Sequence, residues 1–227
     1  MFLGARATQA EYFDSPHRTL AEQRQAYAWL DRVNRFTRFE RPFRVWIPRL
    51  LGEANCRQLT FLDLGAGDGS LGRTLRAWAA GRGWDWHFTG LDLSPIAAQL
   101  DPGGTRVTGS ALAVPFPDAS FDVVIATTMT HHLSNEAAVV THFREAVRTA
   151  RRAVLLVDLH RNALFHAALW LLLVAMRSPA EFRADGTLSV RRGWRVAEWQ
   201  RLAALAGLPP SRVWMEHGTR VLLSVVK

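Results

Sequence analysis

A short stretch of acidic and glycine residues has the composition of a ligand-binding turn. Asp63 precedes glycines at positions 65, 67 and 69, between an apolar run and a helical pattern. Glycines let the backbone turn tightly and approach a ligand closely. Residues 67–72 fit the Gly-x-Gly-x-x-Gly pattern of dinucleotide sites, and residues 63–69 fit an acidic variant, Asp-x-Gly-x-Gly-x-Gly.

The carboxylates distinguish between these two kinds of site. A dinucleotide presents an anionic pyrophosphate to such a turn, and both Asp63 and Asp68 would repel it. A cationic ligand with ribose hydroxyls would instead be attracted. Asp92 ends the next apolar run, where an acidic side chain can accept hydrogen bonds from both ribose hydroxyls. The pattern therefore favours a positively charged nucleoside ligand.

Three histidines follow later apolar runs and could act as bases. His131 and His132 come after the run that ends at Ala126, and His160 comes after the run that ends at Asp158. With an ordinary pKa of about 6.5, an imidazole can take a proton from a phenol. Paired histidines can equally cap a helix or shape a loop, and the sequence leaves both roles open.

Aromatic and basic residues outside these runs predict the character of a second ligand. Tyr12 lies before the first apolar run, and Phe165 and Trp170 follow the fifth, so that they could line an apolar pocket. Arginines recur every three residues from position 32 to position 44, and Arg35 in this series is a candidate contact for an anionic or carrier-bound ligand. Core packing or a solvated helix face would explain the same residues.

From residue 59 onward, short apolar runs alternate with helical patterns. This alternation predicts a parallel sheet with right-handed crossovers. The last two strands are joined too briefly for a crossover helix, so they must pair antiparallel. We expect strands at 59–64, 87–92, 106–108, 121–126, 153–158, 211–215 and 221–226, and helices at 70–80, 95–100, 135–148 and 196–206.

The flanking segments have different patterns. Residues 20–51 are helical in period, and we expect Pro42 and Pro48 to break them into pieces. Residues 163–176 are almost entirely apolar but fall short of the about 20 residues needed to span a bilayer. We expect them to form a buried helix or a hydrophobic lid rather than a helix on a membrane surface, although an interface or membrane role stays open. The polar residues 178–194 predict a loop.

Together these elements predict an α/β, Rossmann-like fold. Its seven-stranded sheet is mostly parallel, and its last strand is antiparallel. Residues 1–58 are expected to form a helical N-terminal cap. Residues 59–227 are expected to form the ligand-binding domain, with a lid insertion at 159–195 after the fifth strand.

The formal net charge of +8 is unevenly spread. Residues 1–58 carry ten basic and six acidic groups, residues 59–158 carry eight and ten, and residues 159–227 carry ten and four. The acidic centre suits a cationic ligand and argues against nucleic acid as the partner. Cys56, the only cysteine, excludes an internal disulfide, and the N-terminus lacks a signal-peptide pattern, so a cytoplasmic setting is expected.

A further stretch resembles a known family. Residues 109–124, GSALAVPFPDASFDVV, resemble the G-D-A-x-x-L-P-F-x-D-x-S-F-D-x-V segment of ubiquinone-biosynthesis-type class I S-adenosylmethionine methyltransferases. The acidic glycine pattern and the His131-His132-Leu133 sequence are similar to the same group. The resemblance implies S-adenosylmethionine as cofactor. It implies that Asp63, Gly65, Gly67 and Gly69 hold the methionine part, Asp92 the ribose, and Ser110 and Ala111 the adenine, with Leu93 and Thr127 completing the site.

Departures from familiar motifs narrow the expected reaction. Ser110 stands where the family usually has an aspartate, which weakens the expected adenine contact. Residues 126–129 lack the Asn/Asp-Pro-Pro-aromatic motif of base-amine methylation, and Lys227, the only lysine, excludes a Lys-Asp-Lys-Glu tetrad. Metal-dependent catechol-type enzymes have an Asp after strand four and Asp-Asn after strand five. This sequence has Ala126-Thr127 and Asp158-Leu159 at those places, so no metal is expected.

The resulting expectation is methyl transfer to a hydrophobic, phenolic or polyketide-like small molecule. Transfer to oxygen, without a metal, is the expected reaction, and secondary metabolism is the expected setting. RNA methylation and a non-catalytic cofactor-binding role remain as alternatives. The sequence also leaves a homodimer open.

Overall fold

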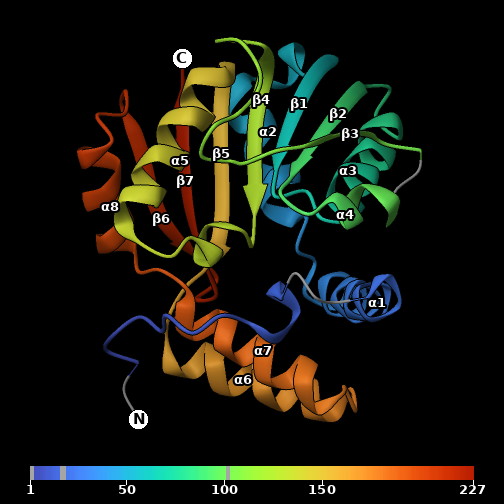
Figure 1. Cartoon of the computed structure of the whole chain (residues 1–227). Helices are drawn as coiled ribbons and strands as arrows, with labels where there is room; N and C mark the ends of the chain where they lie inside the picture. The colour runs from blue at the N-terminus through green and yellow to red at the C-terminus, as the bar shows by residue number, and fades with distance from the viewer. Residues whose placement is uncertain (1–2, 16–18, 101–102) are drawn as a thin grey trace.

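The computed structural model describes residues 3–15, 19–100 and 103–227, and a seven-stranded sheet forms its centre (Figure 1). The strand order is β3-β2-β1-β4-β5-β7-β6. Strands β1 to β5 are parallel, and β7 is antiparallel to both β5 and β6, so β7 is the one reversed strand among the described residues. The predicted sheet is confirmed. The strands are β1 Gln58–Leu64, β2 Asp85–Asp92, β3 Thr105–Thr108, β4 Phe121–Thr127, β5 Ala150–Leu159, β6 Ser211–Glu216 and β7 Arg220–Val226.

Helices cover both faces of the sheet, which explains why its central strands are almost continuously apolar. On one face, α2 (Arg41–Leu51) and α3 (Ser70–Ala80) bury Phe43 and Leu75 against the strands. On the other, α5 (Glu136–Thr149) and α8 (Val196–Leu205) bury Phe143 and Trp199. The short helix α4 (Pro95–Leu100) follows β2.

A third group of helices lies beyond the carboxyl ends of the parallel strands (Figure 1). It contains α1 (Leu20–Thr37), α6 (Ala163–Ala175) and α7 (Ala180–Arg192), which meet in a small apolar cluster around Val33, Leu173 and Phe182. Three short 3-10 helices complete the description: η1 Tyr12–Asp14, η2 Glu53–Asn55 and η3 Thr130–His132. None of the described helices combines the length and apolarity needed to cross a bilayer.

Two predictions about the N-terminal helices were wrong. Pro48 does not break the helix, because it lies inside α2, which continues to Leu51. The cost of the one missing backbone hydrogen bond is outweighed by burial, because Phe43, Ile47 and Pro48 itself are all buried. The spacing of the arginines predicts an adjacent run on one helix up to Pro42, but α1 ends at Thr37 and Arg38 adopts a left-handed conformation.

Two predictions about residues 159–195 were also wrong. Residues 178–194 were expected to form a loop, yet most of them form α7, whose Phe182 and Val190 are buried. Tertiary packing here overrides the weak helix preference of Gly186 and its polar neighbours. The alternative that α6 is a buried helix is wrong, because only its Leu173 is buried, and the lid alternative stays a prediction.

Candidate active site

The turn between β1 and α3, residues 65–69, is the glycine loop. Its three glycines, Gly65, Gly67 and Gly69, have φ angles of 71°, 52° and 76°. This left-handed region is one that residues with a Cβ avoid. The backbone N–H groups of Gly65 and Ala66 donate to the carbonyl of Leu91, at 2.8 and 3.1 Å. The loop is therefore fixed against the carboxyl end of β2.

Asp92 joins the glycine loop to β2. Its Oδ2 accepts a hydrogen bond from the N–H of Gly67 at 2.8 Å, and its Oδ1 accepts one from the N–H of Ser94 at 2.9 Å. Each carboxylate oxygen can accept a further hydrogen bond. Asp92 is thus held in one orientation and keeps acceptor capacity for a pair of hydroxyls.

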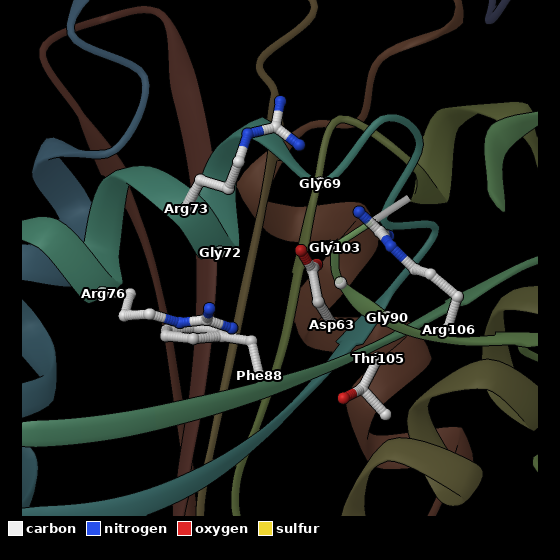
Figure 2. Close-up of a pocket in the computed structure, with 11 residues that line it drawn as sticks. Asp63, Gly69, Gly72, Arg73, Arg76, Phe88, Gly90, Gly103, Thr105 and Arg106 are labelled. Carbon is white, nitrogen blue, oxygen red and sulfur yellow. The ribbon is translucent and has the colours of Figure 1, made fainter. Parts of the chain in front are cut away.

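Asp63 is a buried carboxyl group whose Oδ1 has no hydrogen-bond partner among the described residues. Burial raises its pKa to about 7, although the nearby charge of Arg106 opposes this rise. It lines a cavity of about 160 Å³ between α3 and the strands β2 and β3, together with Phe88, Thr105 and Arg106 (Figure 2). A cationic ligand group would stabilise this carboxylate, so Asp63 fits the ammonium of a methionine moiety.

Two further side chains cover the glycine loop, and the sequence did not point to either. A Cβ added at Gly67 would lie 2.8 Å from Cε1 of Tyr27 in α1, and one added at Gly65 would overlap Met129. Burial raises the pKa of Tyr27, and the negative charges of Asp92 and Asp68 add to the effect. A hollow of about 540 Å³ opens beside the Tyr27 ring, between α1, α3 and α4.

The remaining predicted cofactor residues lie at the same edge of the sheet. Thr127 ends β4, and Ser110 and Ala111 follow β3. Ser110 Oγ accepts a hydrogen bond from the N–H of Leu112 at 3.1 Å, and its second lone pair could serve an adenine amino group. Leu93, after β2, is exposed. Their contacts with a cofactor stay predictions.

His131 in η3 is held by a buried carboxylate at the end of β5. Its Nδ1 lies 2.7 Å from Oδ1 of Asp158, whose Oδ2 accepts the backbone N–H of His131 at 2.8 Å. Burial alone would raise the pKa of Asp158, but the interactions with His131 and the N–H of Leu159 hold it below its ordinary value. An ionised Asp158 places the imidazole proton on Nδ1, which leaves Nε2 as an acceptor.

The free edge of His131 faces the N-terminal segment. Its Nε2 lies 3.6 Å from Oε1 of Glu11, and Nδ1 of His132 lies 3.0 Å from Oδ2 of Asp14. Burial raises the pKa of Glu11 to about 7. Burial would also raise the pKa of Asp14, but hydrogen bonds from His132 and Arg192 outweigh it and hold that pKa at about 2.

Residues 3–14, here called the N-terminal strap, lie across the cluster of His131, His132 and Asp158 and are hydrogen-bonded to it. The guanidinium of Arg6 donates to the carbonyls of His131 and Leu133, at 2.5 and 2.9 Å, and lies over the Trp194 ring. Burial, with repulsion from Arg192, lowers the pKa of Arg6 to about 10. Nothing in the sequence connects the strap with β4, so its part in the site is known only from the fold.

Glu11, His131 and His132 could also be considered as metal ligands, since one atom of each lies within 4.8 Å of the others. However, Arg192 already supplies positive charge here. Its Nη1 lies 3.5 Å from Oε1 of Glu11 and 3.1 Å from Oδ2 of Asp14. A divalent cation would have to displace or repel this guanidinium, so the cluster suits proton transfer better.

Most of the other predicted residues have partners of their own, and of these residues Tyr12 lies next to Glu11 in the strap. His160 is hydrogen-bonded to Asn162 at 3.1 Å, and burial, with the charges of Arg195 and Arg161, lowers its pKa. Arg35 pairs with Asp31 at 2.7 Å and its side chain is 72% exposed. The N–H of Tyr12 donates to Asp185 of α7, the N–H of Phe165 is capped by Asn162, and Trp170 is largely exposed on α6.

Comparisons with known proteins agree with this geometry. A family model described as a methyltransferase domain matches residues 62–157. The chain is similar to the solved structure of the plantazolicin methyltransferase, with 11% identity, a TM-score of 0.71, and coverage of 95% of this chain and 92% of that one. No curated protein matches the chain's sequence.

Two other solved structures are similar over less of their length. One is magnesium protoporphyrin IX methyltransferase from Synechocystis PCC 6803, with 15% identity, a TM-score of 0.54, and 83% of each chain covered. The other is an Anabaena variabilis protein assigned as a methyltransferase of an antibiotic biosynthesis pathway, with 19% identity and a TM-score of 0.53. That match covers 74% of this chain and 61% of the Anabaena protein.

The matched residues include the glycine loop, Asp92 with acceptor capacity on its carboxylate, and the buried Asp63, whose Oδ1 has no hydrogen-bond partner among the described residues. Their roles toward the cofactor stay predictions. Related structures contain the demethylated cofactor S-adenosylhomocysteine, and S-adenosylmethionine is the methyl donor of this family. Residues 62–157 match a methyltransferase domain, and the whole chain has the fold of S-adenosylmethionine-dependent methyltransferases.

Proposed function

We propose that this enzyme methylates an oxygen atom of a hydrophobic, phenolic or polyketide-like small molecule, without a metal ion. The observation that carries the proposal is the Asp158–His131 pair, whose imidazole Nε2 is free to accept a proton. This pair lies at the carboxyl ends of β4 and β5, and Met129, two residues before His131, packs against the glycine loop. This arrangement supports a base beside the bound methyl donor.

S-adenosylmethionine, when bound, supplies a methyl group on a positively charged sulfur, which leaves as a neutral thioether. The main task of the protein is to align the acceptor oxygen with that methyl, and positioning of this kind can contribute roughly 7–11 kcal/mol. A phenolic oxygen must also lose its proton. In this proposal Nε2 of His131 accepts that proton, and Asp158 stabilises the resulting imidazolium through Nδ1.

Glu11 adjusts the base from the other side. Its carboxyl oxygen lies 3.6 Å from Nε2 of His131, close enough to stabilise the imidazolium once it forms. A carboxyl with a pKa of about 7 is ionised in a large part of the molecules at neutral pH. His132, bonded to Asp14, is less buried and could contact the acceptor from the solvent side.

The acceptor class is supported by the surroundings of the site and by the comparisons. Helix α7 contacts η1 and η3, and the apolar helix α6 packs against α7, so this side of the site would suit a hydrophobic molecule better than a polar one. Similar structures include methyltransferases of plantazolicin, of magnesium protoporphyrin IX and of an antibiotic pathway. These share the modification of small or natural-product molecules.

One experiment tests cofactor binding, and a second tests methyl transfer to oxygen. Isothermal titration should show binding of S-adenosylmethionine and S-adenosylhomocysteine, and Asp92→Asn should weaken both. A panel of phenols, polyketides and amines, followed by mass spectrometry, should yield O-methyl products. Asp158→Asn should lower kcat by about 100-fold or more while cofactor affinity stays unchanged, because the wrong imidazole tautomer is then stabilised. Methylation of amines alone would refute O-methylation.

A further inference from the structure

Helix α6 has an apolar face that nothing in the described structure covers. Twelve of its thirteen residues are apolar, and His166 is the exception. At 100° per residue, its residues divide into two arcs. The inner arc, around Leu169 and Leu173, packs into the cluster with α1 and α7. The outer arc consists of Ala163, Leu164, Ala167, Ala168, Trp170, Leu171, Val174 and Ala175, and all eight are exposed.

The extent of this exposure is unusual for a surface helix. Leu164 is 81% exposed, Leu171 60%, Trp170 48% and Val174 41%. Surface helices of globular proteins normally turn polar residues toward water, and helices that are apolar all round are normally buried. Single exposed leucines are common, but a continuous apolar stripe along a whole helix marks a contact surface.

The position of α6 makes the stripe accessible. Helix α6 is the outermost layer beyond the carboxyl ends of the strands, with α7 between it and the sheet (Figure 1). Its thirteen residues would measure about 20 Å, too short to cross a bilayer but suited to lying along its surface. Trp170 lies at the edge of the apolar arc, where the amphipathic indole of an interfacial helix is normally found.

The charges around the stripe indicate what covers it. In residues 160–195, the charged side chains that are not buried are Arg177, Glu181, Arg183, Arg191 and Arg195, four of them basic. Arg177 directly follows the helix, and Arg191 lies close enough to lower the pKa of His166, after the larger effect of burial. A second copy of this chain, which also has a formal net charge of +8, would bring its basic groups against these basic groups and repel them. Anionic headgroups would complement them.

We propose that the outer face of α6 binds an anionic lipid surface, with its apolar side chains in the acyl region and the flanking arginines among the headgroups. The α6–α7 hairpin also borders the acceptor cluster, because Arg192 at the end of α7 contacts Glu11 and Asp14. An enzyme bound in this way holds the acceptor cluster near the bilayer, where hydrophobic molecules accumulate. The binding itself does not depend on the proposed methyl transfer.

Vesicle flotation with the full-length protein tests the proposal. The wild-type protein should float with vesicles of phosphatidylcholine and phosphatidylglycerol, bind pure phosphatidylcholine much less, and be partly released when NaCl rises from about 0.1 M to about 1 M. Leu164→Glu/Leu171→Glu should reduce the bound fraction about tenfold or more, since both side chains lie in the outer arc. Circular dichroism should show the wild-type fold, because neither residue is buried.

The matched control is Leu205→Glu on α8, where the leucine is 56% exposed but lies outside the stripe. This variant should float like the wild type. Asp92→Asn should float normally as well, so a failed cofactor site and a failed lipid surface are distinguishable. Wild-type protein that stays unbound, or loses binding equally with Leu205→Glu, overturns the proposal. So does a stable dimer in solution that Leu164→Glu/Leu171→Glu dissociates.

Discussion

At the scale of single residues, Glu11 is a carboxyl group whose ionisation falls in the physiological range. Its folded-state pKa of about 7 lies above the ordinary value of 4.5 because the side chain is buried. If ionised Glu11 stabilises the imidazolium of His131, then kcat/KM of the wild type should rise as pH increases through about 7. Glu11→Gln should lose this rise, and its kcat should be lower at pH 8. An unchanged pH profile in Glu11→Gln would exclude Glu11 from the reaction.

Asp63 illustrates how a predicted binding residue can oppose stability. Its pKa is raised to about 7 in the folded protein, so its contribution to stability is fully present below about pH 4 and is lost as pH rises through about 7. Asp63→Asn removes the buried charge. Its thermal unfolding midpoint should therefore exceed that of the wild type at pH 8, and the difference should shrink toward pH 4.

The same substitution should abolish binding of S-adenosylmethionine, because an amide cannot neutralise an ammonium group. Differential scanning calorimetry at several pH values, with titration of the cofactor, measures both effects. A variant that is less stable at pH 8 than the wild type would show that the raised pKa of Asp63 is not a source of instability. Asp68→Asn, a change of the same type in a less buried loop residue, provides the control.

At the scale of elements, the packing of α1 on the glycine loop can be measured. Gly67 combines a left-handed φ of 52° with close contact to Tyr27, whereas Gly83 has a φ of 73° and nothing within 4 Å of an added Cβ. Gly83→Ala should cost about 1 kcal/mol of unfolding free energy from backbone strain alone. Gly67→Ala should cost roughly 2–3 kcal/mol, because the Tyr27 ring must also shift.

A double-mutant cycle isolates the contact. In the Tyr27→Ala background, Gly67→Ala should cost about as much as Gly83→Ala, since only the strain remains. Urea unfolding provides the free energies. An equal cost of Gly67→Ala in both backgrounds would mean that α1 does not pack on the loop in solution.

The elements that could be predicted from sequence are those with strong local signals. The glycine loop, Asp92 and the alternation of strands and helices follow from residue type and period, and the sheet confirms the alternation. Helix α7 was missed because its Asp185, Gly186 and Thr187 are weak helix formers, and its stability comes from packing on α6 and the strap. The exposure of α6 could not be predicted, since apolar composition does not indicate which side is covered.

The candidate acceptor site was predictable only in part. His131 and His132 stood out because they follow a strand, yet their partners come from distant parts of the chain: Glu11 and Asp14 from the strap, Asp158 from β5 and Arg192 from α7. Contacts between residues so far apart in the chain produce no periodic pattern from which a single sequence could predict them. His160, chosen by the same reasoning as His131, is bonded to Asn162 instead.

At the scale of the whole molecule, the charge distribution leads to a prediction about metals. Arg192, itself buried, lies against Glu11 and Asp14, so the cluster is already balanced by a fixed positive charge. Turnover should therefore survive dialysis against EDTA, and added Zn²⁺ or Mg²⁺ should not raise it. Activity lost on chelation and restored by one metal would instead identify Glu11, His131 and His132 as ligands.

The N-terminal strap places the proposed acceptor contacts and the predicted cofactor residues in separate parts of the chain. The predicted cofactor residues come from one continuous stretch between β1 and β4. The proposed acceptor contacts include Arg6, Glu11 and Asp14 from a short segment far away in the chain. The strap crosses the site without contributing a strand to the sheet. Substitutions in the strap can therefore alter the proposed acceptor contacts while the sheet and the predicted cofactor residues stay unchanged.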